Sequence, residues 1–172
     1  GSDTLVQTIT IGSGPLPQAA FTAEMTEGCP PLTVQFADDS NGDPVSWNWT
    51  FPGGEPAVSD QSDPVVTYEE PGFYPVKLTV TNGFGSDTVL VEEYIEVLTA
   101  PVAGFGVEVA DLTVQFTVPA PLSGWTYQWF FGDGQSAAGP APVHVYDAPG
   151  EYNVLLVVSS ACGSDTLMRP VT

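Results

Sequence analysis

Short segments in which apolar and polar residues alternate run through most of the chain. Leu32, Val34 and Phe36 are separated by single polar residues, a period of two that turns one face of a strand inward. No stretch has the apolar stripe at 3.6-residue spacing that marks a helix packed on a core. The pattern predicts an all-β protein built from short antiparallel strands. The same alternation relates Val45, Trp47, Trp49 and Phe51; Trp125, Tyr127, Trp129 and Phe131; Tyr74, Val76, Leu78 and Val80; and Tyr152, Val154, Leu156 and Val158.

Four blocks of sequence occur twice in the same order. Leu-Thr-Val-Gln-Phe at 32–36 recurs letter for letter at 112–116, and Gly-Ser-Asp-Thr at 85–88 recurs at 163–166. A repeat of roughly 80 residues has the size of a small β-sandwich rather than of a solenoid repeat. The repeats therefore predict two tandem antiparallel β-sandwiches. The other two blocks pair residues 49–54 with 129–134, and residues 71–78 with 149–156.

The repeats also predict where the domains begin and end. We expect the first sandwich at residues 17–98 and the second at 99–172. Gly-Ser-Asp-Thr occurs a third time at 1–4, followed by the strand-like residues 5–11. We interpret residues 1–16 as the closing strand of a preceding repeat or as a linker, so that a short N-terminal strand precedes the two sandwiches. The alternative is that this strand pairs with the first module.

The charge of the chain is strongly acidic. Its 21 Asp and Glu residues face only Lys77 and Arg169, which gives a formal net charge of −19. This excludes a nucleic-acid partner, because such a protein needs basic groups to displace condensed counterions. No window approaches the roughly 18 consecutive apolar residues of a membrane span, so we expect no membrane insertion. The acidic surface is either a solvated, soluble one or a binder of cations.

The inventory of reactive side chains predicts that the chain is not an enzyme. His144 is the one histidine, so a Ser-His or Cys-His pair is impossible in the first module and a zinc cluster is impossible anywhere. Carboxylates do occur close together, but on the turns of an open sandwich rather than in a cleft.

One turn of the first module concentrates oxygen ligands. Asp38, Asp39, Asn41 and Asp43 place three carboxylates and an amide around Gly42. Calcium takes six to eight oxygens, and a tight loop with a glycine can direct several of them at one point. We therefore predict a Ca²⁺ site in the first domain only, since residues 118–124 of the second contain no acid. The alternative is an ordinary polar turn, which the same residues favour.

Two aromatic residues of the second module are candidates for ligand binding. The alternation places most aromatic rings inward, but it leaves Trp125 at the edge of a strand and Phe130 on the outward face. A flat ring can stack on a sugar or on a protein ligand. The alternative is that these are isolated exposed aromatics, which are common on protein surfaces.

The second module resembles the PKD (polycystic kidney disease) domain. The motifs are Trp-Phe-Phe-Gly-Asp-Gly at 129–134, Pro-Val-His-Val-Tyr at 142–146 and Pro-Gly-Glu-Tyr-Asn-Val at 149–154. Phe130 departs from the family, which has Asp there. The first module is similar to a bacterial variant with Phe-Pro-Gly-Gly at 51–54 and with Val66 in place of the histidine.

The resemblance implies an immunoglobulin-like sandwich of about seven strands in each module. Such modules accompany bacterial secreted proteases and polysaccharide-degrading enzymes, or adhesins and surface proteins, as spacers or substrate-binding accessories. Some PKD-like domains of bacterial collagenases bind calcium through acids of the loop that Asp38 to Asp43 occupy here.

The two cysteines fall at positions that resemble the two ends of one intradomain bridge in related modules. Each module here has only one of them: Val109 replaces Cys29 in the second module, and Phe84 replaces Cys162 in the first. A bridge between Cys29 and Cys162 would have to span both modules, which an end-to-end tandem disfavours. Two free thiols would in turn be unusual in a secreted protein.

The sequence therefore predicts a monomeric, non-catalytic module pair of a larger bacterial secreted or cell-surface protein. Its first expected role is that of a spacer or adhesive-array element, stiffened by calcium. The alternative is a substrate-targeting accessory of a secreted hydrolase, which would bind a polysaccharide or an extracellular protein. Neighbouring domains of the same polypeptide are the other expected partners.

Overall fold

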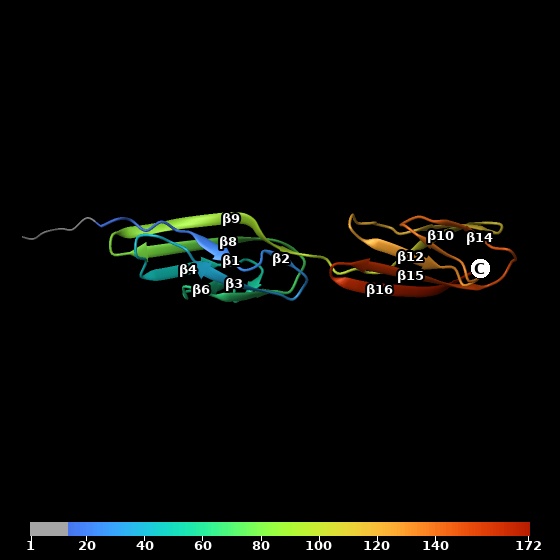
Figure 1. Ribbon diagram of the computed structural model, residues 1–172, viewed down its shortest axis with the longest axis horizontal. Coiled ribbons are helices and arrows are strands. Elements are labelled where there is room, and N and C mark those ends of the chain that lie inside the picture. The colour runs from blue at the N-terminus through green and yellow to red at the C-terminus, as the bar shows by residue number, and fades with distance from the viewer. Residues whose placement is uncertain (1–13) are drawn as a thin grey trace, which may run out of the picture. The chain divides into compact units, whose positions relative to one another are not determined.

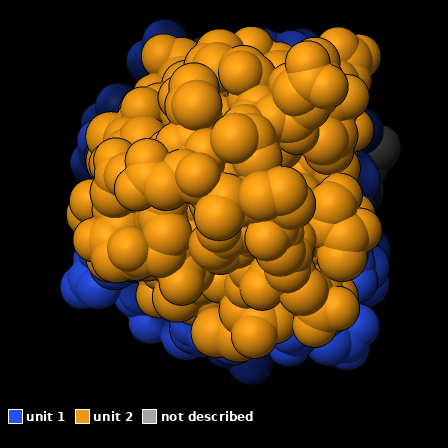
Figure 2. All heavy atoms as spheres, turned by 90° about the vertical axis from the view of Figure 1, so that its right-hand side faces the viewer, with its two compact units in different colours: residues 1–27, 31–96 blue, residues 28–30, 97–172 orange. Residues whose placement is uncertain are grey.

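The computed structural model describes residues 14–172, so the strand predicted at residues 5–11 lies outside the described residues. Every regular element in the described part is a strand (Figure 1). Within residues 14–172, no helix has the length and apolar character needed to cross a membrane. Contacts divide the described residues into two compact units, 14–27 with 31–96 and 28–30 with 97–172, which Figure 2 distinguishes by colour.

The first unit contains two antiparallel sheets. One sheet has the order β1-β3-β7-β5 and the other has the order β2-β9-β8-β4-β6. The strands are β1 (Phe21–Ala23), β2 (Glu27–Gly28), β3 (Leu32–Asp38), β4 (Ser46–Thr50), β5 (Gly54–Glu55), β6 (Val58–Ser59), β7 (Val65–Tyr68), β8 (Gly72–Asn82) and β9 (Gly85–Val97). Their inward side chains form the core, among them Val34, Phe36, Trp49, Phe51, Val66, Tyr68, Val76, Leu78, Val80 and Ile95, all fully buried.

The second unit repeats this arrangement with sheets β10-β11-β14 and β13-β12-β15-β16. Its strands are β10 (Gly106–Ala110), β11 (Thr113–Thr117), β12 (Thr126–Phe130), β13 (Ser136–Ala138), β14 (Val143–Val145), β15 (Tyr152–Ser160) and β16 (Gly163–Val171). One apolar cluster fills the space between the two sheets. It includes Phe105, Val114, Phe116, Tyr127, Trp129, Phe131, Tyr146, Val154, Leu156 and Val158.

The alternation read from the sequence is confirmed in these strands, because the two faces of each strand differ in burial. In β3, Val34 and Phe36 are fully buried while Thr33 is exposed, and Val114 and Phe116 repeat this in β11. The prediction was wrong for Val45, which is 72% exposed. Val45 precedes β4, so its side chain is not held on the inner face of that strand.

Polar side chains of the repeated blocks make equivalent hydrogen bonds in the two sandwiches. The side chain of Gln35 donates to the carbonyls of Asp63 and Pro64, and that of Gln115 donates to the carbonyls of Ala141 and Pro142. The repeated aspartates act alike: Asp87 accepts a hydrogen bond from the Ala19 N–H at 2.8 Å, and Asp165 accepts one from the Ala103 N–H at 2.7 Å. Since partly buried polar groups need partners, these residues are structural.

Candidate functional site

The most unusual polar cluster among the described residues is a histidine–aspartate pair in the second unit. His144 lies in the middle of β14 and is 7% exposed. Its Nε2 lies 2.7 Å from Oδ2 of Asp133, which belongs to the turn between β12 and β13. The imidazole stacks on Phe131 with a centroid distance of 4.0 Å and meets Tyr146 edge-on at 4.5 Å. The pair is thus fixed on three sides.

The surroundings of this pair shift two pKa values. Burial opposes the ionisation of Asp133, but hydrogen bonds from the Gln135 N–H and from His144 outweigh it and lower the pKa of the carboxyl group. Burial, followed by the charge of Asp133 and the neighbouring Tyr152, raises the pKa of Tyr146 to about 12. The Tyr146 hydroxyl donates to the carbonyl of Phe131 at 3.0 Å. The hydrogen bonds of Asp133 and His144 therefore hold the turn between β12 and β13 against β14.

The first unit has no such pair. Val66 of β7 is opposite Val34, as His144 of β14 is opposite Val114. Gly53 stands at the place of Asp133, with a φ of 77°, and Gly54 leaves room for the Val66 side chain. Across residues 14–172, no three His, Cys, Asp or Glu side chains gather in a way that could hold a metal ion. The Asp133–His144 pair is therefore best explained as part of the core.

The four predicted calcium ligands lie in and after the end of β3. Asp38 is already engaged: one carboxylate oxygen accepts from the indole N–H of Trp47 at 2.8 Å and the other from the Ser40 N–H at 3.2 Å. The backbone of Asn41 pairs with Gln18, and the side chains of Asp39, Asn41 and Asp43 are exposed. The structure thus places the four residues in one loop without gathering them around one point, and the calcium site stays a prediction.

The two candidate aromatic residues differ in their exposure. Trp125 is half-buried and packs against the core of the second unit, and its role in ligand binding stays a prediction. Phe130 is 42% exposed on the outer face of β12. It is opposite Leu155 of β15, which is in turn opposite Met168 of β16. These three side chains form an apolar row across three strands, which the sequence analysis did not identify beyond Phe130.

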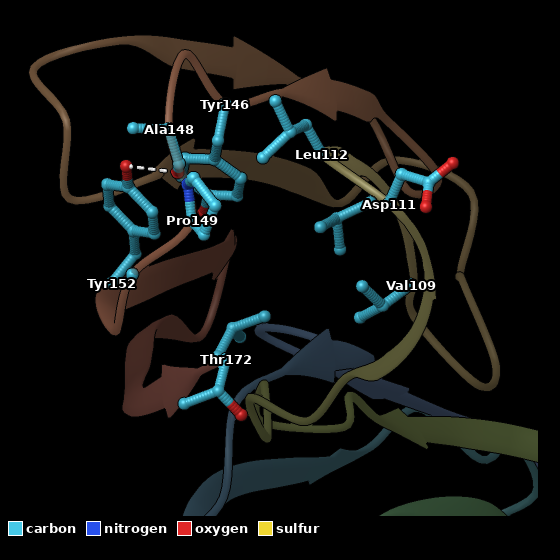
Figure 3. A pocket seen from close by; sticks show the side chains of 11 residues that line it. Val109, Asp111, Leu112, Tyr146, Ala148, Pro149, Tyr152 and Thr172 are labelled. Carbon is cyan, nitrogen blue, oxygen red and sulfur yellow. Dashed lines mark hydrogen bonds between the residues drawn. The ribbon is translucent and has the colours of Figure 1, made fainter.

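The second unit also contains a cavity of about 390 Å³ at the end of β16. Figure 3 shows Val109, Leu112, Tyr146 and Thr172 around it, with the carboxylate of Asp111 pointing away. On its other side, the hydroxyl of Tyr152 donates to the carbonyl of Ala148 at 2.9 Å. The lining is thus predominantly apolar. No pattern in the sequence indicates this cavity, because its residues come from β10, β11, β15, β16, the turn between β10 and β11, and the loop between β14 and β15.

Cys29 and Cys162 form a disulfide, with 5.3 Å between their Cα atoms, so the expectation that no bridge joins them was wrong. The reason lies in the segment Gly28–Pro30. Although it includes the last residue of β2 and the start of the connection to β3, its contacts assign it to the second unit, which also contains Cys162 in the turn between β15 and β16. The expectation treated Cys29 as part of the first sandwich. An alignment of the two repeats cannot show that a short segment of the first repeat makes its contacts with the second unit.

The comparisons with known proteins agree with this architecture. The family profile described as the PKD domain matches residues 13–97 and again residues 98–171. The chain belongs to the PKD domain family. PKD domains are typically extracellular, non-catalytic modules, and here two of them stand in tandem.

This PKD pair is similar to two known proteins, one by sequence and one by structure. Human polycystin-1 is 32% identical over a match of 126 residues, and the match covers 66% of this chain and 3% of polycystin-1. The chain therefore spans a very small part of that relative. A solution NMR structure of a protein from Methanosarcina mazei is 36% identical, over 57% of this chain and 65% of its own, with a TM-score of 0.39.

Proposed function

We propose that this PKD pair is a non-catalytic spacer or adhesive element of a larger bacterial secreted or cell-surface protein. The observation that supports this most is the disulfide between Cys29 and Cys162, whose sequence separation is 133 residues. Disulfides persist in oxidising, extracellular compartments. When tension is applied to the two ends of the chain, the covalent path runs directly from residue 29 to residue 162. All strands from β3 to β15 are then protected from being pulled out.

Single-molecule force spectroscopy on the whole chain tests this role. In the oxidised protein, only the residues outside the bridge should extend under force. Reduction should release a further length of roughly 450 Å, from 133 residues at about 3.4 Å each. The double variant Cys29→Ser/Cys162→Ser should release this length without reductant. Equal extension of the oxidised and reduced protein would contradict the proposal that the disulfide protects the strands of this spacer from force.

Calcium stiffening of the first domain belongs to the same proposal. Its support is the concentration of Asp38, Asp39, Asn41 and Asp43 in one loop, with exposed oxygens on the last three. Free calcium at ten times its dissociation constant would stabilise the domain by about 1.4 kcal/mol. We expect calcium to raise the melting temperature of chelator-treated protein, and Asp39→Ala to abolish the effect. An identical melting curve with and without calcium would remove this part of the proposal.

The second candidate role is that of a substrate-targeting accessory of a secreted hydrolase. It is favoured by the apolar row of Phe130, Leu155 and Met168, because the corresponding pair in the first unit is polar: Thr50 is opposite Lys77. Pull-down on insoluble chitin, cellulose and collagen tests this role. Phe130→Ala should release the protein from its ligand, and Phe73→Ala, at a 59% exposed site of the first unit, should not. Equal retention of both variants would dismiss Phe130 as a ligand contact.

A further inference from the structure

The outer face of the sheet β13-β12-β15-β16 in the second unit has no charged side chain on its strands within residues 14–172. The charged residues of β16 point inward: Asp165 accepts from the Ala103 N–H, and the Arg169 guanidinium lies 4.1 Å from the ring centroid of Phe105. We call this outer surface the neutral face. It consists of Thr126, Gln128 and Phe130 of β12; Ser136 and Ala138 of β13; Asn153, Leu155, Val157 and Ser159 of β15; and Ser164, Thr166, Met168 and Pro170 of β16.

The first unit shows that the fold does not need apolar side chains at the centre of this face. Phe130, Leu155 and Met168 are opposite one another across β12, β15 and β16. In the equivalent pair of the first unit, Thr50 is opposite Lys77. Phe130 and Met168 are 42% and 61% exposed, so water contacts much of their apolar surface. Because the same fold forms with a hydroxyl and an amine at two of these positions, the apolar row points to a ligand.

The absence of charge restricts the kind of partner that fits the neutral face. A protein partner presents ionised side chains over much of its surface, and their burial against a face without opposite charges costs free energy. An anionic polymer is repelled by a chain with a net charge of −19. A cationic polymer would bind the exposed acids elsewhere on the chain. The neutral face therefore suits an uncharged polymer.

The side chains of the neutral face combine apolar groups with hydrogen-bonding groups. Gln128 lies beside the apolar row on β12, and Asn153 lies on its other side on β15; both side chains are exposed. Neighbouring strands are 4.7–4.9 Å apart in a sheet, so the row from Phe130 to Met168 extends over about 10 Å. A pyranose ring has an apolar C–H face and a rim of hydroxyl groups, which match these two kinds of side chain.

We propose that the neutral face binds an uncharged polysaccharide with exposed pyranose faces, of the β-linked kind found in cellulose and chitin. The inference rests on the substrate-targeting role given above and names the substrate class of that role. The side chains of Phe130, Leu155 and Met168 contact the apolar ring faces. The amides of Gln128 and Asn153 form hydrogen bonds with the hydroxyl groups. Since no ions meet at this contact, salt screening leaves its strength unchanged.

Adsorption of the whole chain on insoluble polymers tests the proposal. The probes are microcrystalline cellulose and chitin, with fibrous collagen as the protein probe. The bound fraction is measured by the loss of tryptophan absorbance from the supernatant. We expect saturable retention on cellulose or chitin, with an affinity that changes less than about twofold between about 0.05 M and about 1 M NaCl.

Two matched double variants locate the binding surface. Phe130→Thr/Leu155→Lys gives the neutral face the residues that the first unit has, so it is compatible with the fold, and it should weaken retention at least about tenfold. Val143→Thr/Val145→Lys makes similar changes at valines of β14, in the other sheet, which are 58% and 56% exposed. This control should leave retention unchanged. Circular dichroism checks that both variants are folded.

Four results would overturn the proposal. They are no retention on cellulose or chitin at about 0.1 mM protein, retention that high salt removes, equal retention of the two double variants, and a dimer in sedimentation that Phe130→Thr/Leu155→Lys abolishes. Retention on collagen alone, lost in the same variant, would also overturn it but would leave the substrate-targeting role with a protein ligand. Absence of retention on all three probes would remove both the role and this inference.

Discussion

The two PKD units place the same tyrosine in different surroundings. Tyr146 of the second unit directs its hydroxyl to the Phe131 carbonyl and contacts His144, which in turn bonds to Asp133. Its counterpart Tyr68 is fully buried, and its hydroxyl has no hydrogen-bond partner among the described residues. Burial raises the pKa of Tyr68 well above its usual range.

This difference shows how one fold tolerates two kinds of core at its turn. The second unit uses a polar chain of three side chains, all of which have partners. The first has Val66, Gly53 and Gly54 at these places, so the packing there is apolar, and the Tyr68 hydroxyl has no partner within residues 14–172. A graft of the polar version into the first unit would fail, because the Tyr74 ring occupies the space that a Cβ at position 53 would need, and Gly53 has a φ of 77°.

The largest expected effect is the loss of the disulfide, which should affect both units. The loop from Cys29 to Cys162 encloses β3 to β15, so its removal increases the entropy of the unfolded chain in either unit. We expect Cys29→Ser/Cys162→Ser to lower the free energy of unfolding by about 2–4 kcal/mol, measured by urea denaturation. Hydrogen exchange assigns the loss to each unit. A loss confined to one unit would contradict the loop argument.

The next effect breaks the polar chain of the second unit. His144→Val gives β14 the residue that β7 has, but it leaves Asp133 without its imidazole partner and removes the stacking on Phe131. We expect a loss of about 2 kcal/mol in the second unit, seen in the hydrogen exchange of β14 and β11. The matched variant Val66→Ala should affect only the first unit. If His144→Val has no effect on stability, the pair is not a structural feature of the core.

A pair of tyrosine variants compares the two surroundings directly. Tyr146→Phe removes the hydrogen bond to the Phe131 carbonyl and should cost about 1 kcal/mol. Tyr68→Phe removes a buried hydroxyl without a described partner and should be neutral or stabilising by up to about 1 kcal/mol. Urea denaturation of both variants measures the difference. Equal destabilisation by the two changes would mean that the Tyr68 hydroxyl is bonded after all.

The smallest expected effect is the acid sensitivity of the second unit. The pKa of Asp133 is lower in the folded state, so its stabilising contribution is present above its unfolded pKa of about 3.9 and is lost as the pH falls through the folded value. The contribution should be below about 1 kcal/mol, because solvent screens a partly exposed carboxylate. Asp133→Asn should flatten the decline in second-unit stability between about pH 5 and pH 2, measured by hydrogen exchange. An unchanged decline would show that other acids cause it.

The sequence by itself determined the class of fold and most of the core. The alternation of Leu32, Val34 and Phe36 and its exact recurrence at 112–116 predicted two all-β sandwiches, because a period of two can bury only one face of a strand. Pattern alone was less reliable at strand ends, where Val45 is exposed and Trp125 is half-buried. There the neighbouring strand, not the period, decides which way a side chain points.

Tertiary structure alone decided the features that join residues distant in the sequence. The disulfide depends on the assignment of Gly28–Pro30 to the second unit, and the cavity brings together residues of β10, β11, β15 and β16. The sequence places Asp38, Asp39, Asn41 and Asp43 in one loop, and the structure adds that Asp38 bonds to Trp47 while the other three side chains are exposed. The local pattern of apolar and polar residues indicates which face of a strand is buried. It does not indicate that two cysteines 133 residues apart will meet, because the packing of whole strands decides that contact.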